Sequence, residues 1–332
     1  MLRILNLLVR LGLTGSHAGM ISYLVRRLLY AVPILLGVIF ITFLLDNVMM
    51  SPESKASRVL GPKGTGAVRR EWIHNRGLDQ PLPKQFVNYV GNLAKLDFGT
   101  SWVTGRELRE VFLKGVGPSL CITIPGFIAA FFASVGLALF QVFVRNSPLD
   151  RGLTLLSVAL MSVPTMVYVI FTQAFFALGL SYFPAYGFGD VGSGMLRFIA
   201  LPIVIFMLIN LGHDARLYRA IFLEEMGQDY IRTAQAKGLT NSRVLGVHVF
   251  KNGLIAIITL VVAELPRLVL GSLLIESLFG IPGLGNVLVQ AIQTGDQPVI
   301  MVSVFLGSVL YLGAFILTDI LYALADPRIR LS

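Results

Sequence analysis

The sequence predicts an all-α, polytopic membrane protein with six transmembrane helices and both termini in the cytoplasm. Hydrophobic residues make up 55% of the 332 residues and charged residues only 14%, whereas an ordinary globular domain is about 45–50% apolar and about 25% charged. So few charges cannot cover a water-exposed surface, which excludes a soluble globular enzyme and a disordered chain. The single cysteine, Cys121, excludes an internal disulfide framework and a multi-thiolate metal site.

Six apolar stretches are long enough to cross a bilayer, because about 20 helical residues span roughly 30 Å of hydrocarbon. In chain order they are 28–45, 118–144, 153–180, 198–212, 253–275 and 299–324. The fourth is the shortest, and Met195 and Leu196 extend it outward. Helices are expected because backbone amides in lipid must be hydrogen-bonded within the segment. Prolines predict kinks in five of the spans, at Pro33, Pro125, Pro164, Pro202 and Pro266.

The distribution of basic residues predicts the orientation. Arg145 and Arg151 follow the second span, and six Lys or Arg residues lie between the fourth and fifth spans. The segment 276–298 contains none. Because cytoplasmic loops carry the excess of Lys and Arg, the loop 213–252 is expected inside and the long loop 49–117 outside. The net charge of +9 is therefore interpreted as membrane topology, and nucleic acid is not expected as a partner.

The N-terminal residues 1–19 have the basic start, apolar stretch and small-residue end of a signal peptide. Arg10 interrupts the apolar stretch, however, and a more ordinary start follows at Met20. We favour an amphipathic interfacial segment or an upstream start site over a cleaved signal. The chain is accordingly divided into a cytoplasmic or interfacial segment, 1–27, and a transmembrane domain, 28–332.

Residues that carry chemistry are not gathered anywhere in the sequence. The four histidines lie far apart, without the spacing of metal ligands. The glycine-rich run 61–66 lacks the order of lysine and hydroxyl residues of a phosphate-binding loop. We therefore expect no catalytic residue and no metal site, and any uphill transport would be driven by another subunit or by an ion gradient. A stand-alone secondary transporter or channel is the main alternative, although no repeated half is visible, and a membrane enzyme is a more distant one.

The loop 213–252 is longer than a connection between neighbouring helices requires. Within it, residues 229–238 predict a short helix of eight residues, about 12 Å long. Asp229 is expected to cap its N-terminus, Lys237 to suit its negative C-terminal end and Gly238 to permit a left-handed stop. One face is expected to carry small residues that let a partner approach, and it contains Tyr230, Thr233, Ala234 and Lys237. A connector that merely lies on the lipid is the alternative.

This segment resembles the EAA loop of ABC-importer permeases, specifically those of the oligopeptide/dipeptide/nickel family. The general E-A-A-x-x-x-G pattern takes the form R-T-A-x-x-x-G there, matched here by Arg232, Thr233, Ala234 and Gly238. Further matches follow in order at 77–81, 97–101, 248–252, 276–285, 295–298 and 326–330, so that the resemblance covers roughly residues 20–332. Positions shared with the family to which we assign structural roles are Glu276, Pro282, Gly283, Gly285 and Asp319.

The resemblance implies a type I ABC-importer permease fold in a bacterial cytoplasmic membrane. Two related permease subunits would form the pore, and each would place its EAA helix in a groove on one of two ATP-binding subunits. An extracytoplasmic substrate-binding protein would deliver the cargo. ATP and Mg²⁺ would be bound by the partner subunits, and this chain would hold no cofactor. Peptide is the expected cargo, with haem and nickel chelates as alternatives.

Two features depart from the family pattern. Ala256 stands where relatives often have proline, which predicts a straighter start to the fifth span. Glu264 and Arg267 place opposite charges three residues apart within that span, where relatives usually carry small or apolar residues. Charges at membrane depth are rare and tend to face a cavity or each other. The hypothesis is that this pair lines the translocation path or gates it; a self-neutralising pair, or one bonded to the second permease, is the alternative.

Overall fold

The structure is a computed structural model that describes residues 16–61, 64–189 and 194–325. These residues form helices and their connections, with an isolated bridge between Thr100 and Glu107 as their β pairing. The predicted all-α class is confirmed. The predictions for residues 1–15 and for the motif 326–330 lie outside the described residues. By its internal contacts the chain divides into unit 1, Met1–Phe98 with Ile300–Ser332, and unit 2, Gly99–Val299.

Unit 1 contains two long apolar helices. Helix α2 (Ser16–Met49) includes the first predicted span and runs without interruption across residue 27. Most of α15 (Gln297–Ala325) also belongs here and contains the sixth predicted span. Between them in sequence lie the helices α3 (Pro52–Leu60), α4 (Gly66–Asn75) and α5 (Leu82–Ala94), which occupy much of the predicted external loop. The small core of unit 1 is formed by Ile39, Leu93 and Phe305.

Two ion pairs connect the helices of unit 1. Lys55 Nζ lies 2.6 Å from Asp46 Oδ2, with the two side chains only 1% and 8% exposed. Arg27 Nε lies 3.0 Å from Asp319 Oδ2 and so links α2 to α15. Asp319, to which the sequence assigned a structural role, therefore holds two apolar helices together through a charge pair, a contact that becomes stronger away from water.

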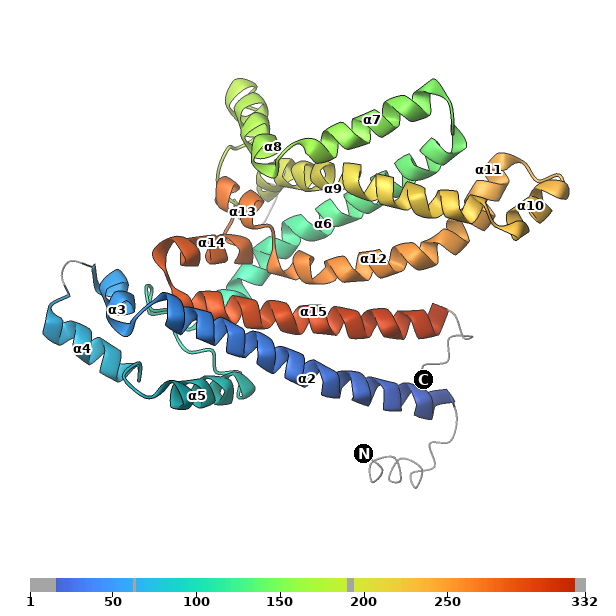
Figure 1. Cartoon of the computed structure of the whole chain (residues 1–332). Helices are drawn as coiled ribbons and strands as arrows, with labels where there is room; N and C mark the ends of the chain where they lie inside the picture. The colour runs from blue at the N-terminus through green and yellow to red at the C-terminus, as the bar shows by residue number, and fades with distance from the viewer. Residues whose placement is uncertain (1–15, 62–63, 190–193, 326–332) are drawn as a thin grey trace. The chain divides into compact units, whose positions relative to one another are not determined.

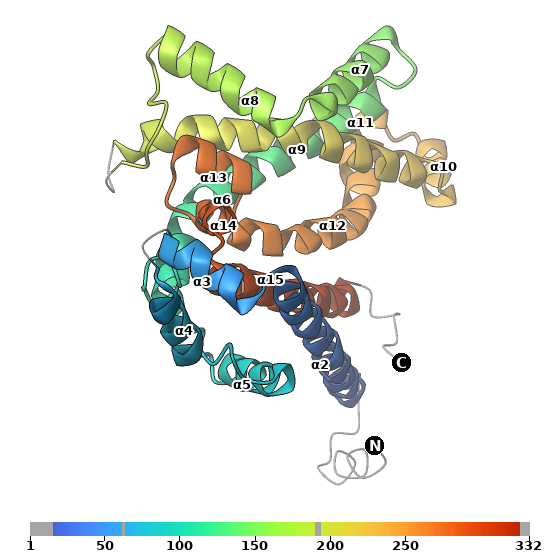
Figure 2. The ribbon, with the colours of Figure 1, turned by 60° about the vertical axis from the view of Figure 1, so that its left-hand side comes forward.

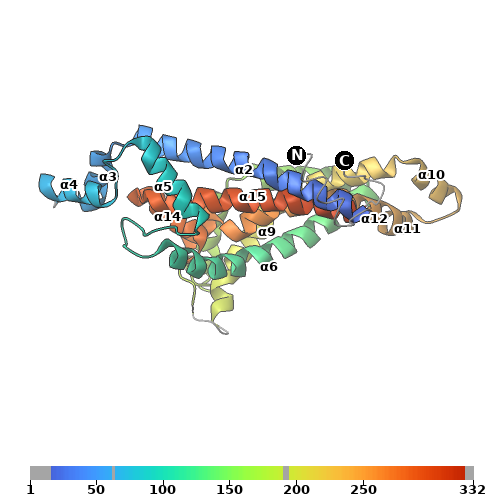
Figure 3. The ribbon, with the colours of Figure 1, turned by 90° about the horizontal axis from the view of Figure 1, so that it is seen from below.

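Unit 2 is built on three long helices. α6 (Leu108–Phe143) and α9 (Met195–Met226) pack along each other, and α12 (Phe250–Leu270) packs against both (Figure 1). The buried apolar residues form two clusters. One surrounds Ile122 and Ile205, and the other surrounds Tyr218, Phe222 and Val249. The short helices α10 (Asp229–Ala236) and α11 (Asn241–Arg243) lie at one end of unit 2, and α14 (Leu284–Thr294) lies at the opposite end (Figures 1 and 3).

The third predicted span is not one helix. α7 (Pro148–Ser162) is followed by α8 (Thr165–Thr172) and a π-helical segment, Gln173–Gly179, and the two halves are bent by 91° (Figure 2). The kink predicted at Pro164 within 153–180 is therefore a full break between two helices, which count as one span only when the bent pair is taken together. The break falls at Val163, whose ψ of 124° is extended, because the ring of Pro164 disfavours helical geometry in the preceding residue.

The fourth and fifth predicted spans also have different limits. α9 continues to Met226, so that helices occupy most of the predicted loop 213–252. The span predicted over 253–275 crosses a break, since α12 ends at Leu270 and α13 (Leu273–Phe279) begins after Gly271, whose φ is 78°. Among the described residues, five helices are long and apolar enough to span a membrane, or six if the bent pair counts as one span. The predicted number of spans agrees with the larger figure.

Candidate functional site

Helix α10 is the short helix that the sequence predicted, with its limits shifted by one residue. It comprises the eight residues Asp229–Ala236. Gln228 precedes it in an extended conformation without a side-chain cap, so Asp229 lies in the first turn and not at the cap. Lys237 follows the last helical residue, and Gly238 has the left-handed φ of 82° that the predicted stop requires.

The inner face of α10 is apolar. Ile231 and Ala234 are 1% and 5% exposed and belong to the cluster around Phe222 and Val249. The placement of Ala234 on a face open to a partner is therefore wrong, because this small side chain lets α10 approach its own chain. The residues exposed on the outer side include Asp229, Tyr230, Arg232, Thr233, Gln235 and Lys237. α10 thus sits on unit 2 through apolar contacts and presents polar groups outward.

The Tyr230 hydroxyl connects α10 to α9 and lies near α12. It donates a hydrogen bond to Glu225 near the end of α9, and the Asn252 side chain in α12 lies close enough to lower the pKa of this hydroxyl. Partial burial and the nearby Glu225 carboxylate raise the pKa of Tyr230 to about 12. The hydroxyl therefore stays protonated near neutral pH and remains a donor.

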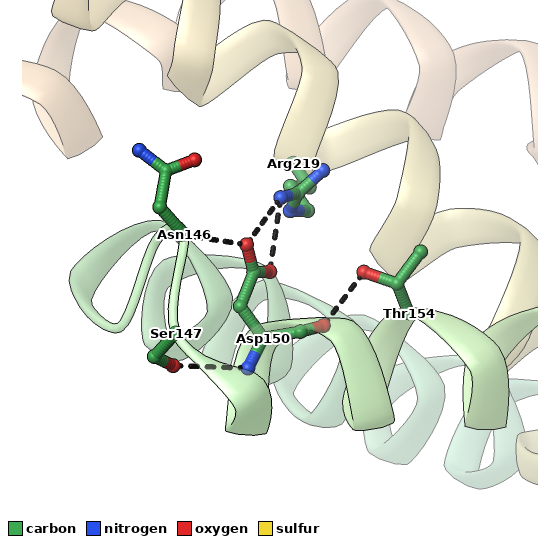
Figure 4. A network of polar contacts seen from close by, with 5 residues as sticks. All are labelled: Asn146, Ser147, Asp150, Thr154 and Arg219. Carbon is green, nitrogen blue, oxygen red and sulfur yellow. Dashed lines mark hydrogen bonds and ion pairs between the residues drawn. The ribbon is translucent and has the colours of Figure 1, made fainter.

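A second polar network, which the sequence analysis missed, lies where α9 passes the start of α7 (Figure 4). The Arg219 guanidinium donates to both carboxylate oxygens of Asp150 at 2.9 Å. The Asp150 carboxylate also accepts from the backbone amide of Asn146 at 3.1 Å, and the backbone amide of Asp150 donates to Ser147 Oγ at 3.2 Å. A local signal existed for half of this network, since Ser147, Pro148 and Asp150 occupy the cap, first and third positions typical of a helix start.

Glu276 is the centre of a buried polar cluster at the α14 end of unit 2. Its side chain is fully buried. One oxygen, Oε1, accepts from the Ser272 amide at 2.9 Å, and Oε2 accepts from the Gly285 and Asn286 amides at 2.8 and 3.3 Å. The last two amides belong to the first turn of α14, where unpaired N–H groups favour a negative charge. Glu276 thus joins the start of α13 to the start of α14.

The glycines of the 276–285 motif make room for this cluster. A Cβ atom on Gly283 would lie 2.2 Å from Glu276 Oε2, and one on Gly285 would lie 2.8 Å from the Ser272 backbone. The hydroxyl of Ser119, on α6, accepts from the Leu284 amide at 2.8 Å. Pro282 is exposed in the connection between α13 and α14. Glu276, Gly283 and Gly285 therefore act together, and Ser119 is a member that local sequence patterns do not indicate.

Two of the motifs at this end are brought together by a buried hydrogen bond. Ser101 Oγ donates to Asp296 Oδ2 at 2.5 Å, and the Trp102 amide donates to Asp296 Oδ1 at 3.0 Å. Ser101 and Asp296 are 2% and 3% exposed. The motifs 97–101 and 295–298, far apart in sequence, thus meet through these residues, and α14 is fixed at both of its ends.

Glu264 and Arg267 form an ion pair of 2.8 Å within α12. The two side chains are about half-buried, at 43% and 45% exposure. Arg267 also donates to Asn210 Oδ1 on α9 at 2.7 Å. The pair is therefore neutralised within unit 2, but it retains an open side.

Metal-binding groups are not gathered in the part of the chain that the structure describes. No set of three His, Cys, Asp or Glu side chains within residues 16–61, 64–189 and 194–325 is arranged to hold a metal ion.

Comparison with known proteins gives a consistent family. Residues 118–331 match the family described as "Binding-protein-dependent transport system inner membrane component", and residues 20–102 match the N-terminal part of such membrane components. A putative peptide transport system permease protein of Brucella abortus (strain 2308) is 32% identical, covering 94% of this chain and 99% of that protein. The oligopeptide transport system permease protein AppB of Bacillus subtilis is 30% identical, with 94% and 100% covered.

The di/tripeptide transport system permease protein DppB of Pseudomonas aeruginosa is also 30% identical, covering 94% of this chain and 99% of that protein. The match extends over both units and includes the apolar helices, α10 and the Glu276 cluster. The chain therefore belongs to the binding-protein-dependent transport system inner membrane component family and is a multi-pass permease subunit of an ABC transporter in the inner membrane.

Proposed function

We propose that this chain forms, with a second related permease, the translocation path of an ATP-driven peptide importer, and that α10 docks on a cytoplasmic ATP-binding subunit. The observation that carries the proposal is the placement of α10. Its apolar side, Ile231 and Ala234, is buried against unit 2, and its polar side is exposed beyond the ends of α9 and α12. A helix fixed in this way can transmit a push from a partner as a rigid body.

The mechanism assigns the chemistry and the movement to different chains. Two ATP-binding subunits would bind ATP and Mg²⁺ and supply the free energy of hydrolysis. In this chain, Tyr230 passes a displacement of α10 to α9 through its hydrogen bond to Glu225, and α12 follows because it packs against α9. Because α9 and α12 both continue through the apolar part of unit 2, their displacement would alter the path between the two permeases.

The far end of unit 2 is the proposed receiving side for cargo. α14 and the Glu276 cluster lie opposite α10 (Figure 3), so an extracytoplasmic substrate-binding protein would approach there. Peptide is the proposed cargo because the relatives described above are named as peptide, oligopeptide and di/tripeptide permeases. The half-exposed pair Glu264–Arg267 offers one group of each sign to the charged termini of a peptide.

The test of α10 uses charge reversal on its exposed side. Arg232→Glu and Lys237→Glu should each lower the amount of ATP-binding subunit that co-purifies with the permease, because both replace a solvent-exposed cation without disturbing buried contacts. Arg145→Glu, an exposed cation on the connection between α6 and α7, is the matched control and should have no effect. Undiminished co-purification of the ATP-binding subunit with both α10 variants would reject the proposed docking.

A further inference from the structure

The contact between α7 and α9 includes a stripe of α9 residues two turns long. Gly212, Arg216 and Arg219 follow at spacings of four and three, which places them on one face of the helix. A Cβ atom on Gly212 would lie 2.5 Å from the Ser157 carbonyl oxygen, so the two backbones touch there. Arg216 Nη1 lies 3.9 Å from Met161 Sδ, and Arg219 reaches Asp150 at the far end of α7.

The Asp150–Arg219 ion pair is shielded from water. The Asp150 side chain is 7% exposed and that of Arg219 is 24% exposed. The Arg219 Nε atom is buried and has no hydrogen-bond partner within the described residues, so Asp150 is the group that compensates the guanidinium charge. Breaking a buried pair is strongly unfavourable because it leaves an uncompensated charge behind. Sliding or rotation of α7 on α9 would break this pair and the Gly212 contact together.

Within the described residues, no ion pair like Asp150–Arg219 connects α7 to α8, the other half of the bent span. α7 ends at Ser162, Val163 and Pro164 are not helical, and α8 leaves at 91° to α7. The Tyr168 hydroxyl, on α8, donates to the Leu160 carbonyl at 2.7 Å and spans this break with a single hydrogen bond. A change in direction between α7 and α8 would break no ion pair among the described residues, although it would shift α8 against α9 and α13, where Val169 is fully buried.

We propose that Asp150 and Arg219 are positioning residues that make α7 move with α9 as one rigid body, while α8 changes direction at Val163–Pro164. The inference rests on the proposed coupling role of α10, because α10 follows directly on α9 and would set this body in motion. α7 would therefore take part in transmitting the movement, although it does not itself contact an ATP-binding subunit.

The first test compares transport with ATP hydrolysis in the assembled transporter reconstituted in vesicles. Asp150→Asn keeps an oxygen for the Asn146 amide but removes the charge, and Arg219→Met keeps an apolar stem of similar length. Each should lower the peptide transported per ATP hydrolysed by about fivefold or more, a size typical of coupling between contacting residues. The double variant should be no worse than the worse single variant. Unchanged ratios, or single effects that multiply in the double variant, would overturn the proposal.

A second measurement needs no disruptive variant. In a Cys121→Ser background, spin labels are placed at exposed positions on α7, α8 and α9: Leu155, Phe171 and Leu217. Between the nucleotide-free and ATP-trapped states, the distance from 155 to 217 should stay constant and the distance from 171 to 217 should change. A changed 155–217 distance, or two constant distances, would each contradict the proposal. The co-purification test of Arg232→Glu and Lys237→Glu reports separately on α10, so failure of the proposed function is distinguishable from failure of this inference.

Discussion

The carboxylate of Glu276 occupies a space that glycine leaves free on two sides. A Cβ atom would lie 2.0 Å from this carboxylate if placed on Gly271 and 2.2 Å if placed on Gly283. Three backbone amides hold the carboxylate in position, so it cannot yield without losing hydrogen bonds. Because Gly271 and Gly283 have no side chains, they leave the space in which this carboxylate is buried.

Gly283→Ala should therefore lower the stability of the purified transporter. Gly283 has φ −95°, which alanine adopts freely, so the expected loss comes from overpacking, at about 1–3 kcal/mol. The measurement is the thermal unfolding temperature of the detergent-solubilised protein. Gly136→Ala on α6 is the control, because no described atom lies within 4 Å of the added Cβ and alanine favours a helix by about 0.5–1 kcal/mol over glycine. Equal melting temperatures for the two variants would contradict the role given to Gly283.

Glu264→Gln and Arg267→Met test whether the ion pair of α12 contacts the cargo. If it does, each variant should reduce peptide uptake by roughly 10-fold or more while the complex assembles normally, because a hydrogen bond to a charged group contributes about 1.5–3 kcal/mol. Uptake of radiolabelled peptide by proteoliposomes measures the effect. Glu110→Gln and Lys114→Met remove another helical pair, on α6, whose side chains are 55% and 76% exposed, and serve as controls. Normal uptake with both α12 variants would leave the pair a structural role only.

The sequence did not reveal the directions in which the helices run. Apolar composition located every long helix, since about 20 apolar residues suffice to mark a span. It could not distinguish a straight span from two halves bent by 91°, because hydropathy contains no direction. Pro164 predicts a kink, but the preceding Val163 is extended, so the helix is interrupted there and not merely bent. At the break, Gly271 also leaves room for Glu276 and for Ser119, which lies on another helix.

The C-terminal stop of α10 was predictable for a local reason. Gly238 stops the helix through its left-handed φ of 82°, a property of the residue itself. Its orientation was predicted wrongly for Ala234, because burial of that side chain depends on the cluster around Phe222, to which residues distant in sequence contribute. Local chemistry thus explains the stop at Gly238, whereas the helix starts one residue before the predicted position, at Asp229, and tertiary packing determines which side is buried.

Tyr230→Phe should loosen the attachment of α10 to α9. The variant retains the ring but removes the donor to Glu225. We expect the ATP-binding subunit still to bind, and the peptide transported per ATP to fall by a few-fold, since a typical hydrogen bond contributes about 0.5–1.5 kcal/mol. Tyr182→Phe, at an exposed position of unit 2, is the control. A ratio equal to that of the control would show that Tyr230 does not transmit movement.

The distribution of charged residues along the whole chain predicts its orientation in the membrane. Few of its residues are charged, 14% in total. Basic residues occur in the segments next to α10 and at the connection between α6 and α7, and eleven more lie in the loop 49–117, which is longer than the roughly 60 residues over which the positive-inside rule applies. The positive-inside rule then places α10 in the cytoplasm and α5 outside. The sequence alone supplied this prediction, because it requires only the order of spans and loops.

Cysteine labelling of spheroplasts tests this orientation. In a Cys121→Ser background, Lys84→Cys on α5 should react with a membrane-impermeant maleimide in intact spheroplasts. Thr240→Cys, next to α10, and Arg145→Cys should react only after permeabilisation. All three positions are exposed, so burial does not prevent the reaction. The reverse pattern of labelling would place both termini outside.

The hydrogen bond between Ser101 and Asp296 brings the two ends of unit 2 together. These residues lie close to the two ends of unit 2, Gly99–Val299, and their side chains are 2.5 Å apart. The polypeptide therefore enters and leaves this unit at one place, as it does in a domain inserted into a host protein. Units with adjacent ends tolerate insertion and circular permutation well. Unit 2 therefore has the adjacent ends that such rearrangements require.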